Sequence, residues 1–263
     1  MTDTAPQRGL FTGVANIVRF NPRFYLAGIC ALALAIPALV YARGLLPPLL
    51  FVPLVAGTAL AAWWLFASLF ASWWIYDLSG LYGWEWLRRH LAPKDRRLVS
   101  AHAGFDETTL SLRAAFPELE IEPVDFHDPE RMTEPSIQRA RRLCPPLPGT
   151  AEVGLGPWPS SGADLVLFPL SAHEWRTPDE RRRLLRHALA ALNDGGRIVL
   201  LEHLRDLPNF IAFGPGFFHF HSAATWERDW QAVDLECVAR SRIAGFLGGF
   251  VLYPRHQIPA SHD

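Results

Sequence analysis

The chain has 263 residues, half of them hydrophobic, and a formal net charge of −1. This length accommodates one domain of ordinary size together with an additional segment. With a net charge near zero, nothing in the composition suggests binding to nucleic acid. Cys30, Cys144 and Cys237 are widely separated and show neither a disulfide framework nor a zinc spacing.

Two uncharged, apolar runs come first in the chain. They extend from Phe24 to Ala42 and from Gly44 to Tyr76, and each exceeds or approaches the about 20 residues that cross a bilayer core. The pair Pro47-Pro48 predicts the turn between them. A cleaved signal peptide fits poorly, because 23 residues precede the first run and a second run follows directly. The alternative is a helical hairpin buried in a soluble protein.

Basic residues lie before and after this hairpin but are almost absent from the loop between its two runs. The loop between the two runs carries only Arg43, whereas the flanks carry Arg19, Arg23, Arg88, Arg89, Lys94, Arg96 and Arg97. By the positive-inside rule, both ends face the cytoplasm, which predicts a multi-pass membrane protein with its soluble part in the cytoplasm. The resemblance given below implies that this membrane is the bacterial inner membrane. Small residues around Ala56-Gly57 would allow two hairpins to pair in a homo-oligomer.

The segment after the hairpin is rich in aromatic and basic residues. Tyr76, Tyr82, Trp84 and Trp86 are of the types that collect at membrane interfaces, and Arg88 suits anionic headgroups. We therefore expect an interfacial linker helix, or a plain aromatic anchor. The expected organisation is a cytoplasmic N-terminal segment (1–23), a transmembrane hairpin (24–76), the linker (77–93) and a soluble domain (94–263).

From residue 94 onward, short apolar runs alternate with helix-like ones. This alternation predicts βαβ units and an α/β fold in which helices cover both faces of a mostly parallel sheet. The expected strands are 97–101, 119–126, 163–170 and 197–203, followed by a closing hairpin at 235–240 and 248–254. The expected helices are 107–117, 136–143, 178–193 and 224–233, the last capped by Ser222.

Polar residues follow each expected strand. They form four groups: 102–106, 125–128, 171–174 and 202–206. Ligands of open α/β sheets bind outside the carboxyl ends of the strands, so the site is expected along this rim.

Three blocks carry a family resemblance: ADLVLFPLSAHEW from Ala163, LNDGGRIVLLEH from Leu192 and HFHSAATWERDWQAVDLECV from His219. Together they resemble class I S-adenosylmethionine-dependent methyltransferases of the quinone-biosynthesis type, over about residues 96–253. The motifs HAGFDE, TEPSI, AHE, EHLRDLPNF and FHFHS resemble a membrane-anchored bacterial subfamily. The resemblance implies a Rossmann-like methyltransferase sheet, S-adenosylmethionine as cofactor and methyltransferase activity. FPLSAHE stands where amide and nucleobase N-methylases have N-P-P-[YF], which argues against those activities.

The resemblance also implies a set of cofactor-binding residues. In the first motif Ser100 takes the acidic place, and His102, Gly104 and Asp106 take the three glycine places, so only the middle glycine matches. Asp125 is implied to bind the ribose hydroxyls, with a turn-forming role before Asp128-Pro129 as the alternative. Glu152 is the nearest candidate for the adenine side. The full expected set is Ser100, His102, Ala103, Gly104, Asp106, Asp125, Phe126 and Ser171.

Histidines dominate the rest of the rim. His173 ends the buried strand closest to the expected methyl group and is a candidate base, with Glu174 as its orienting partner. His219 and His221, in the later loop, complete the catalytic candidates. The same imidazoles suggest a metal site for zinc, iron or manganese, with His173, His203, His219 and His221 as candidate ligands. Separate hydrogen-bonding roles are the alternative.

The loop 204–222 is rich in Phe, Gly and Pro and is expected to be a lid, a membrane-facing flap or a core-packing loop. Together these features predict a membrane-anchored methyltransferase whose partners are the bilayer and a small apolar or membrane-dissolved acceptor: quinone-like, a lipid headgroup or an acyl derivative. One alternative is a decayed methyltransferase domain that serves as a membrane scaffold or sensor. Another is a metal-dependent, non-methylating use of S-adenosylmethionine.

Overall fold

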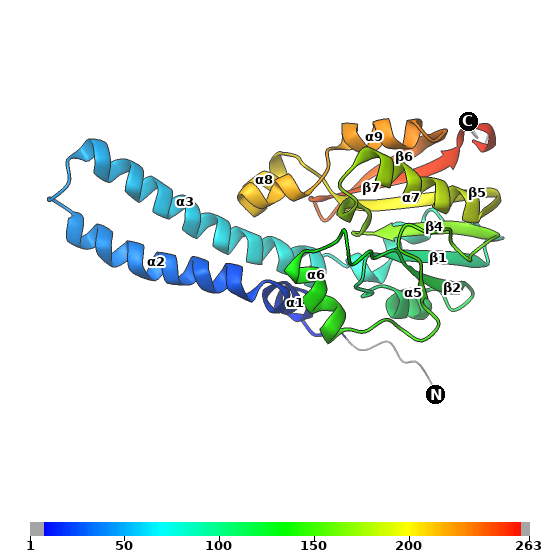
Figure 1. The fold of residues 1–263 in the computed structure, drawn as a ribbon, viewed down its shortest axis with the longest axis horizontal. Helices are drawn as coiled ribbons and strands as arrows, with labels where there is room; N and C mark the ends of the chain where they lie inside the picture. Colours follow the sequence, from blue (N-terminus) through cyan, green and yellow to red (C-terminus); the bar gives the residue numbers. More distant parts are fainter. Residues whose placement is uncertain (1–7, 259–263) are drawn as a thin grey trace.

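The structure is a computed structural model that describes residues 8–258. A seven-stranded sheet with flanking helices forms the main body, and a long helical hairpin projects from one end of it (Figure 1). The expected α/β architecture is confirmed.

The strand order of the sheet is β3-β2-β1-β4-β5-β7-β6. Strands β1 to β5 are parallel, and β7 is antiparallel to both of its neighbours. The order reverses between β1 and β4, and a switch point of this kind opens a crevice at the carboxyl ends of the two strands. The strands are β1 (Arg97–His102), β2 (Glu120–Asp125), β3 (Ala151–Glu152), β4 (Ala163–Pro169), β5 (Leu192–His203), β6 (Leu235–Ile243) and β7 (Leu247–Pro254).

The sheet separates two hydrophobic cores, because successive side chains of a strand point to opposite faces. Leu98 and Leu165 belong to one core, while their neighbours Val99 and Val166 belong to the other. Four helices pack on the sheet or beside it: α5 (Thr109–Ala115), α6 (Pro135–Leu143), α7 (Pro178–Ala191) and α9 (Ala223–Gln231). The Ser222 hydroxyl accepts the N–H of Thr225 at 3.1 Å, which confirms the expected cap of α9.

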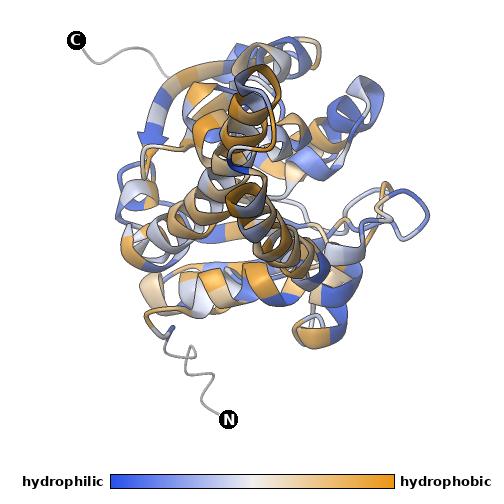
Figure 2. Cartoon of the chain, turned by 90° about the vertical axis from the view of Figure 1, so that its left-hand side faces the viewer, coloured by the Kyte–Doolittle hydropathy of each residue, from blue (hydrophilic) through white to orange (hydrophobic). Residues whose placement is uncertain are grey.

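The two apolar runs form helices α2 (Pro22–Ala42) and α3 (Pro48–Trp73). Both are long and apolar enough to cross a membrane, and the body of the protein buries only 6% of the apolar window in α2 and 0% in the one that includes α3. Seen end-on, the hairpin presents apolar residues around most of its surface (Figure 2). The alternative of a hairpin buried within the protein is therefore wrong.

The segment after α3 differs from the expected interfacial helix. It consists of a π-turn η1 (Trp74–Leu78), a 3₁₀ turn η2 (Leu81–Gly83) and a short helix α4 (Glu85–Arg88). Trp84 is 0% exposed and packs in the sheet core with Phe116, and its indole N–H donates to the Ser111 hydroxyl at 3.1 Å. The expected place of Trp84 at the membrane interface is wrong. A Trp whose N–H has a partner is as well suited to a core as to an interface, so its residue type alone does not separate the two.

Two helices were not expected from the sequence. Helix α1 (Thr12–Phe20) lies between the hairpin and the sheet body, where the Asp77 carboxylate accepts the N–H of Gly13 at 2.6 Å and that of Val14 at 3.0 Å. Helix α8 (Leu207–Phe213) lies beside α3, and the Trp63 indole donates to the Ile211 carbonyl at 3.1 Å (Figure 1). Three short 3₁₀ turns complete the described elements: η3 (Ala172–Glu174), η4 (Gly214–His219) and η5 (Arg255–Gln257).

Candidate functional site

A cavity of about 450 Å³ lies at the carboxyl ends of β4 and β5. Ser171, His173 and Glu174 line it from the sheet side. Residues of α1, α6 and the base of the hairpin, among them Phe20 and Tyr76, line the opposite side. The cavity therefore joins the polar rim of the sheet to the segment that leads into the apolar hairpin.

A buried carboxylate orients His173 in this cavity. Glu202, at the end of β5, is 0% exposed and its Oε2 lies 2.5 Å from Nδ1 of His173. Its other oxygen accepts the backbone N–H groups of Ser171, Ala172 and His173. Because Nδ1 is bound to a carboxylate, Nε2 of His173 is left to face Glu174 and the cavity.

Glu174 and His219 complete this cluster. Oε1 of Glu174 lies 3.4 Å from Nε2 of His173 and 3.5 Å from Nε2 of His219. Burial alone would lower the pKa of His173, but the Glu202 and Glu174 carboxylates raise it to about 10. Burial would raise the pKa of Glu174, but the two imidazoles hold it well below its usual range. The structure thus brings together three of the four catalytic candidates.

His203 lines the same cavity, but both of its ring nitrogens have partners. Nε2 lies 2.9 Å from the Tyr76 hydroxyl, and Nδ1 lies 2.9 Å from Oδ1 of Asn209. Burial lowers the pKa of His203 to about 4, although the Asn209 contact opposes this shift. His203 is therefore a neutral side chain that connects the hairpin base to α8.

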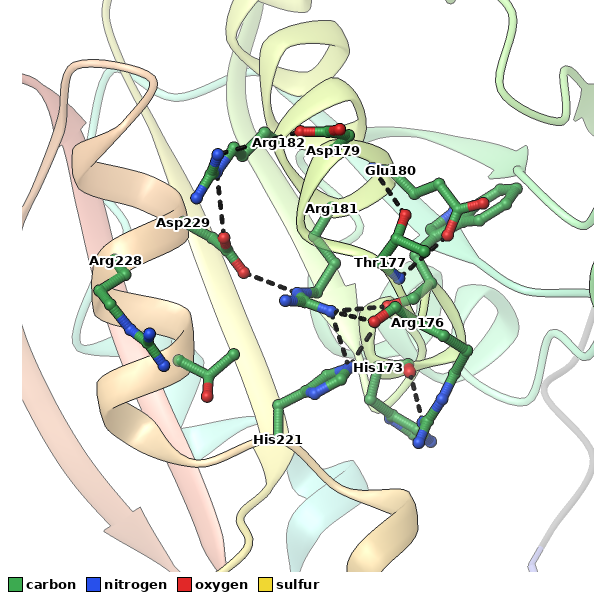
Figure 3. A network of polar contacts seen from close by, with 12 residues as sticks. His173, Arg176, Thr177, Asp179, Glu180, Arg181, Arg182, His221, Arg228 and Asp229 are labelled. Carbon is green, nitrogen blue, oxygen red and sulfur yellow. Dashed lines mark hydrogen bonds and ion pairs between the residues drawn. The ribbon is translucent and has the colours of Figure 1, made fainter.

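His221, expected as a catalytic and metal-binding candidate, lies outside the residues that line the cavity. Its Nε2 is 3.3 Å from the Trp175 carbonyl and 3.3 Å from Nη1 of Arg181, which is ion-paired with Asp229 (Figure 3). Burial and the adjacent guanidinium lower the pKa of His221 to about 3. The side chain belongs to a buried network between α7 and α9, and it does not join the other histidines.

Strand β1 and the loop after it hold five of the cofactor candidates. Gly104 adopts a φ of +79°, which favours glycine, and Ala103 lines the cavity. Asp106 accepts the N–H groups of Thr108 and Thr109 at 3.0 and 2.9 Å and so starts α5. Ser100, in the acidic place of the motif, lies 3.2 Å from the Thr108 hydroxyl.

His102, the last residue of β1, is buried at 2% exposure. Neither ring nitrogen has a hydrogen-bond partner within residues 8–258, and the carboxylates of Asp106 and Asp125 are each 3.8 Å away. Burial lowers the pKa of His102 despite these two carboxylates. A buried polar group without a partner costs about 1–3 kcal/mol, so this loop has bonding capacity for a ligand.

Asp125, expected to bind ribose hydroxyls, is already fully bonded. Its Oδ1 accepts the N–H groups of Gly104 and His127 at 2.8 and 2.9 Å, and its Oδ2 pairs with Arg141 of α6. Arg141 also pairs with Glu152 at 2.7 Å, so one guanidinium occupies both of the acidic positions expected on the nucleoside side. Asp125 and Glu152 are absent from the cavity lining for this reason.

The other two cofactor candidates differ in their placement. Ser171 lines the cavity and its hydroxyl donates to the Ala101 carbonyl at 2.9 Å. Phe126 is 0% exposed and packs against Phe168 and Trp175 in the core, away from the cavity. Glu202 lies on the predicted rim but was not among the predicted site residues, and Arg141 was not predicted at all. No local signal reveals Arg141, because its partners are distant in the chain.

No family model and no curated protein matches this sequence. Among solved structures, one described as PigF with SAH is 16% identical with a TM-score of 0.50 and covers 71% of this chain and 58% of that one. A SAM-dependent methyltransferase from Aquifex aeolicus is 10% identical, with a TM-score of 0.47 and coverages of 67% and 93%. The mitomycin 7-O-methyltransferase MmcR is 15% identical, with a TM-score of 0.48 and coverages of 94% and 74%.

These likenesses concern the fold. The chain has a Rossmann-like methyltransferase fold, and the match to the first of these structures spans 58% of that protein's length. At such identities a shared fold does not carry an activity or a substrate with it.

Proposed function

We propose that this protein is an S-adenosylmethionine-dependent methyltransferase, held at the bacterial inner membrane by its hairpin, with its sheet domain in the cytoplasm. Its acceptor would be an apolar or membrane-dissolved molecule with a reactive hydroxyl, such as a quinol-like ring or a lipid headgroup. The observation that carries this proposal is the cavity, which is lined on one side by His173 and Glu174 and on the other by Tyr25, Ser72 and Tyr76 of the hairpin.

The walls of the cavity favour an apolar acceptor. Phe20, Phe105, Phe213 and Phe220 contribute rings to it. Polar side chains line it both at the end formed by β4 and β5 and on the opposite side, where Asn21, Glu107 and Glu134 lie. A site of this kind buries the apolar body of a ligand and fixes its orientation through a few polar contacts.

Helix α8 supports a position at the membrane surface. Leu207 is 67% exposed and Ile211 is 47% exposed, on a helix that contacts α3 through Trp63 and Trp64. Of the three alternatives for the loop 204–222, this arrangement favours the membrane-facing flap. Exposed apolar side chains beside a spanning helix are stabilised when they transfer from water into lipid.

His173 would receive the proton of an acceptor hydroxyl in the fraction of molecules in which its Nε2 is unprotonated. Since its pKa is raised to about 10, this fraction increases as the pH rises toward 10. Glu202 fixes its ring, so that Nε2 faces the cavity rather than the backbone. Glu174 and His219 stand on the far side of Nε2 and would orient the acceptor oxygen. Positioning of the nucleophile is the main contribution that an enzyme makes to a displacement at an activated methyl group.

The residues of the β1 loop fit S-adenosylmethionine on one condition. His102, Thr109 and Asp106 offer buried polar atoms without partners in the described chain, and Ala103 and Ser171 open onto the cavity. When bound, the cofactor supplies a sulfonium-activated methyl group. On the nucleoside side, Asp125 and Glu152 would hold it only after Arg141 has turned away. The Arg141 side chain is 23% exposed, so it has solvent to turn into.

Binding of S-adenosylhomocysteine to the detergent-purified full chain is the first test. Calorimetry should give micromolar affinity for the wild type and no binding for Gly104→Val, because a side chain there meets Arg141 and His127 at 3.0–3.1 Å and φ is positive. Gly149→Val, a positive-φ glycine with nothing within 4 Å of a Cβ, is the matched control.

Label transfer is the second test. Proteoliposomes that contain the protein, methyl-labelled S-adenosylmethionine and a phenolic amphiphile should accumulate label in the lipid phase, and His173→Gln should abolish the transfer while it preserves cofactor binding. Label that appears only on water-soluble phenols would contradict the membrane-dissolved acceptor.

One observation favours a second candidate function. Arg141 bridges Asp125 and Glu152 and so fills the nucleoside side with the protein's own side chain, as a domain without a cofactor would do. The protein would then be a membrane scaffold or sensor. Absence of S-adenosylhomocysteine binding in both the wild type and Arg141→Ala would select this function over the first.

A further inference from the structure

Three potential ligand atoms converge at the end of the cavity formed by β4 and β5. They are Nε2 of His173, Oε1 of Glu174 and Nε2 of His219, and all lie within 4.8 Å of one another. His173 and Glu174 belong to one 3₁₀ turn after β4, whereas His219 comes from the end of η4, so two separate segments meet here.

Two of the three separations among these atoms suit a bound cation better than they suit hydrogen bonds within the cluster. The two imidazole–carboxylate separations are 3.4 and 3.5 Å, longer than an ordinary N–H···O hydrogen bond of about 2.7–3.2 Å. Two ligands on the edge of a tetrahedron around zinc, each about 2.0–2.1 Å from the ion, lie about 3.3–3.4 Å apart. The second oxygen of Glu174 is buried and has no partner within the described residues.

The surroundings of His173 are those of a metal-binding imidazole. Its Nδ1 is bound to the Glu202 carboxylate at 2.5 Å, and Glu202 is held by three backbone N–H groups. A ligand histidine usually donates its second ring N–H to a carboxylate, which fixes the tautomer and aims the free nitrogen at the ion. Here that outer contact is already in place.

We propose that His173, Glu174 and His219 bind one divalent transition-metal ion, with zinc as the preferred ion and the fourth position open to the cavity. Two imidazoles and one carboxylate with an open position are a ligand set of catalytic zinc sites. The ion would replace the proton on Nε2 of His173 and add positive charge beside two carboxylates, Glu174 and Glu202.

This set corrects the ligands expected from the sequence. His203 is occupied by Tyr76 and Asn209, and His221 faces Arg181. Glu174, which was expected only to orient His173, takes the place of His203 and His221 in the proposed ligand set.

The open position gives the ion a function in the cavity. An acceptor hydroxyl bound there would ionise at a lower pH, because the cation stabilises the oxyanion. That consequence rests on the proposed function, whereas the binding of the ion does not.

Metal titration of the full chain in detergent tests the site. Protein stripped with a chelator should bind one equivalent of Zn²⁺, and Co²⁺ in its place should give the intense visible bands of a tetrahedral site. Glu174→Gln and His219→Gln should each weaken Zn²⁺ binding by more than about 100-fold, beyond the about 10–100-fold loss expected for Glu202→Gln as an outer partner. His256→Gln, an exposed histidine remote from the cavity, should leave binding unchanged.

The outcomes separate this inference from the proposed function. Absence of Zn²⁺ binding, or binding that Glu174→Gln and His219→Gln do not alter, would overturn the metal site. Circular dichroism and S-adenosylhomocysteine affinity of the same variants exclude a folding defect as the cause of a loss. Stoichiometric Zn²⁺ binding without any methyl transfer would support the metal site and contradict the proposed methyltransferase function. Methyl transfer by metal-free protein would leave the methyltransferase and remove the ion from its chemistry.

Discussion

The polar residues at the strand ends differ between the two halves of the rim. On one half the partners of the buried carboxylate enclose it, and on the other half a partner of the buried carboxylate faces a cavity. On the β1–β2 half, Asp125 is 1% exposed and all of its bonding capacity is taken by Gly104, His127 and Arg141. On the β4–β5 half, Glu202 is equally buried, yet it directs His173 toward a cavity of about 450 Å³. Both halves carry buried carboxylates at the ends of parallel strands.

A carboxylate at a strand end therefore indicates a ligand site only if one of its partners has a further hydrogen-bonding atom that faces a cavity. Asp125 is closed because a guanidinium from α6 reaches it. The oxygens of Glu202 are occupied as well, but one of its partners is the His173 imidazole, whose second nitrogen faces the cavity. Occupancy of the partner, rather than the rim position, therefore distinguishes a ligand site from a structural ion pair.

The largest expected effect comes from Glu202→Ala. Three backbone N–H groups and the His173 imidazole would lose their acceptor inside the protein. We expect the free energy of unfolding to fall by about 3–5 kcal/mol, measured by chemical denaturation in detergent. Glu236→Ala, whose side chain is 49% exposed and pairs with Arg255, should change it by less than about 0.5 kcal/mol. Equal effects of the two substitutions would contradict the role of Glu202.

Acidification should weaken the β4–β5 half next. His203 is 4% exposed with its pKa lowered to about 4, while an unfolded His titrates near 6.5. Stability from this group is therefore complete above pH 6.5 and is lost as the pH falls toward 4, by about 3 kcal/mol at the lower limit. Thermal denaturation between pH 7 and pH 4 measures the dependence of stability on pH. His203→Gln should reduce this dependence, and His221, whose pKa is lowered to about 3, should supply part of what remains. A dependence equal to that of the wild type would contradict the role of His203.

Asp125→Ala tests the closed half. The N–H groups of Gly104 and His127 would become unpaired and Arg141 would lose one of its two carboxylates. We expect a loss of about 2 kcal/mol in the free energy of unfolding and no S-adenosylhomocysteine binding. Asp128→Ala, in the exposed turn that follows, should cost less than about 1 kcal/mol and preserve binding.

Arg141→Ala should have the smallest effect on stability and the most informative effect on binding. Its partner Glu152 is 61% exposed, so that ion pair contributes little. Its other partner, Asp125, is 1% exposed and keeps two backbone N–H donors, so the loss of the guanidinium should cost about 1–2 kcal/mol. Release of Asp125 and Glu152 should tighten S-adenosylhomocysteine binding about tenfold, which corresponds to about 1.4 kcal/mol. Arg142→Ala, exposed on the same helix, is the control. Weaker binding by Arg141→Ala would mean that Arg141 contacts the cofactor.

The fold was largely predictable because its signals are local. The run 163–170 and the helix that follows it have unambiguous period and caps, and β4 and α7 lie where these signals predicted. The four rim groups were also predicted, because strand ends are read from the same pattern. Helix α1 was missed because it begins without a side-chain cap and gains its N-terminal partner from Asp77, far away in the chain.

The details of the site were less predictable, because they depend on long-range partners. His221 and His219 are two residues apart and chemically alike, yet one faces Arg181 in a buried network and the other faces Glu174. Which neighbour an imidazole meets is decided by the packing of η4 against η3. Neither the spacing nor the composition of the chain contains that information.

The path of α3 has a mechanical consequence. The helix passes from its apolar length directly into η1 and η2, and Ile75, Leu81 and Trp84 are buried within the body of the protein at 0–2% exposure. A domain on a flexible tether samples many heights above a bilayer, whereas a domain joined to a spanning hairpin by a buried segment would be held at a single height. If the hairpin spans a bilayer as proposed, membrane thickness would control the proposed reaction. A thicker or thinner membrane would tilt the hairpin and move the mouth of the cavity relative to the depth of a dissolved acceptor.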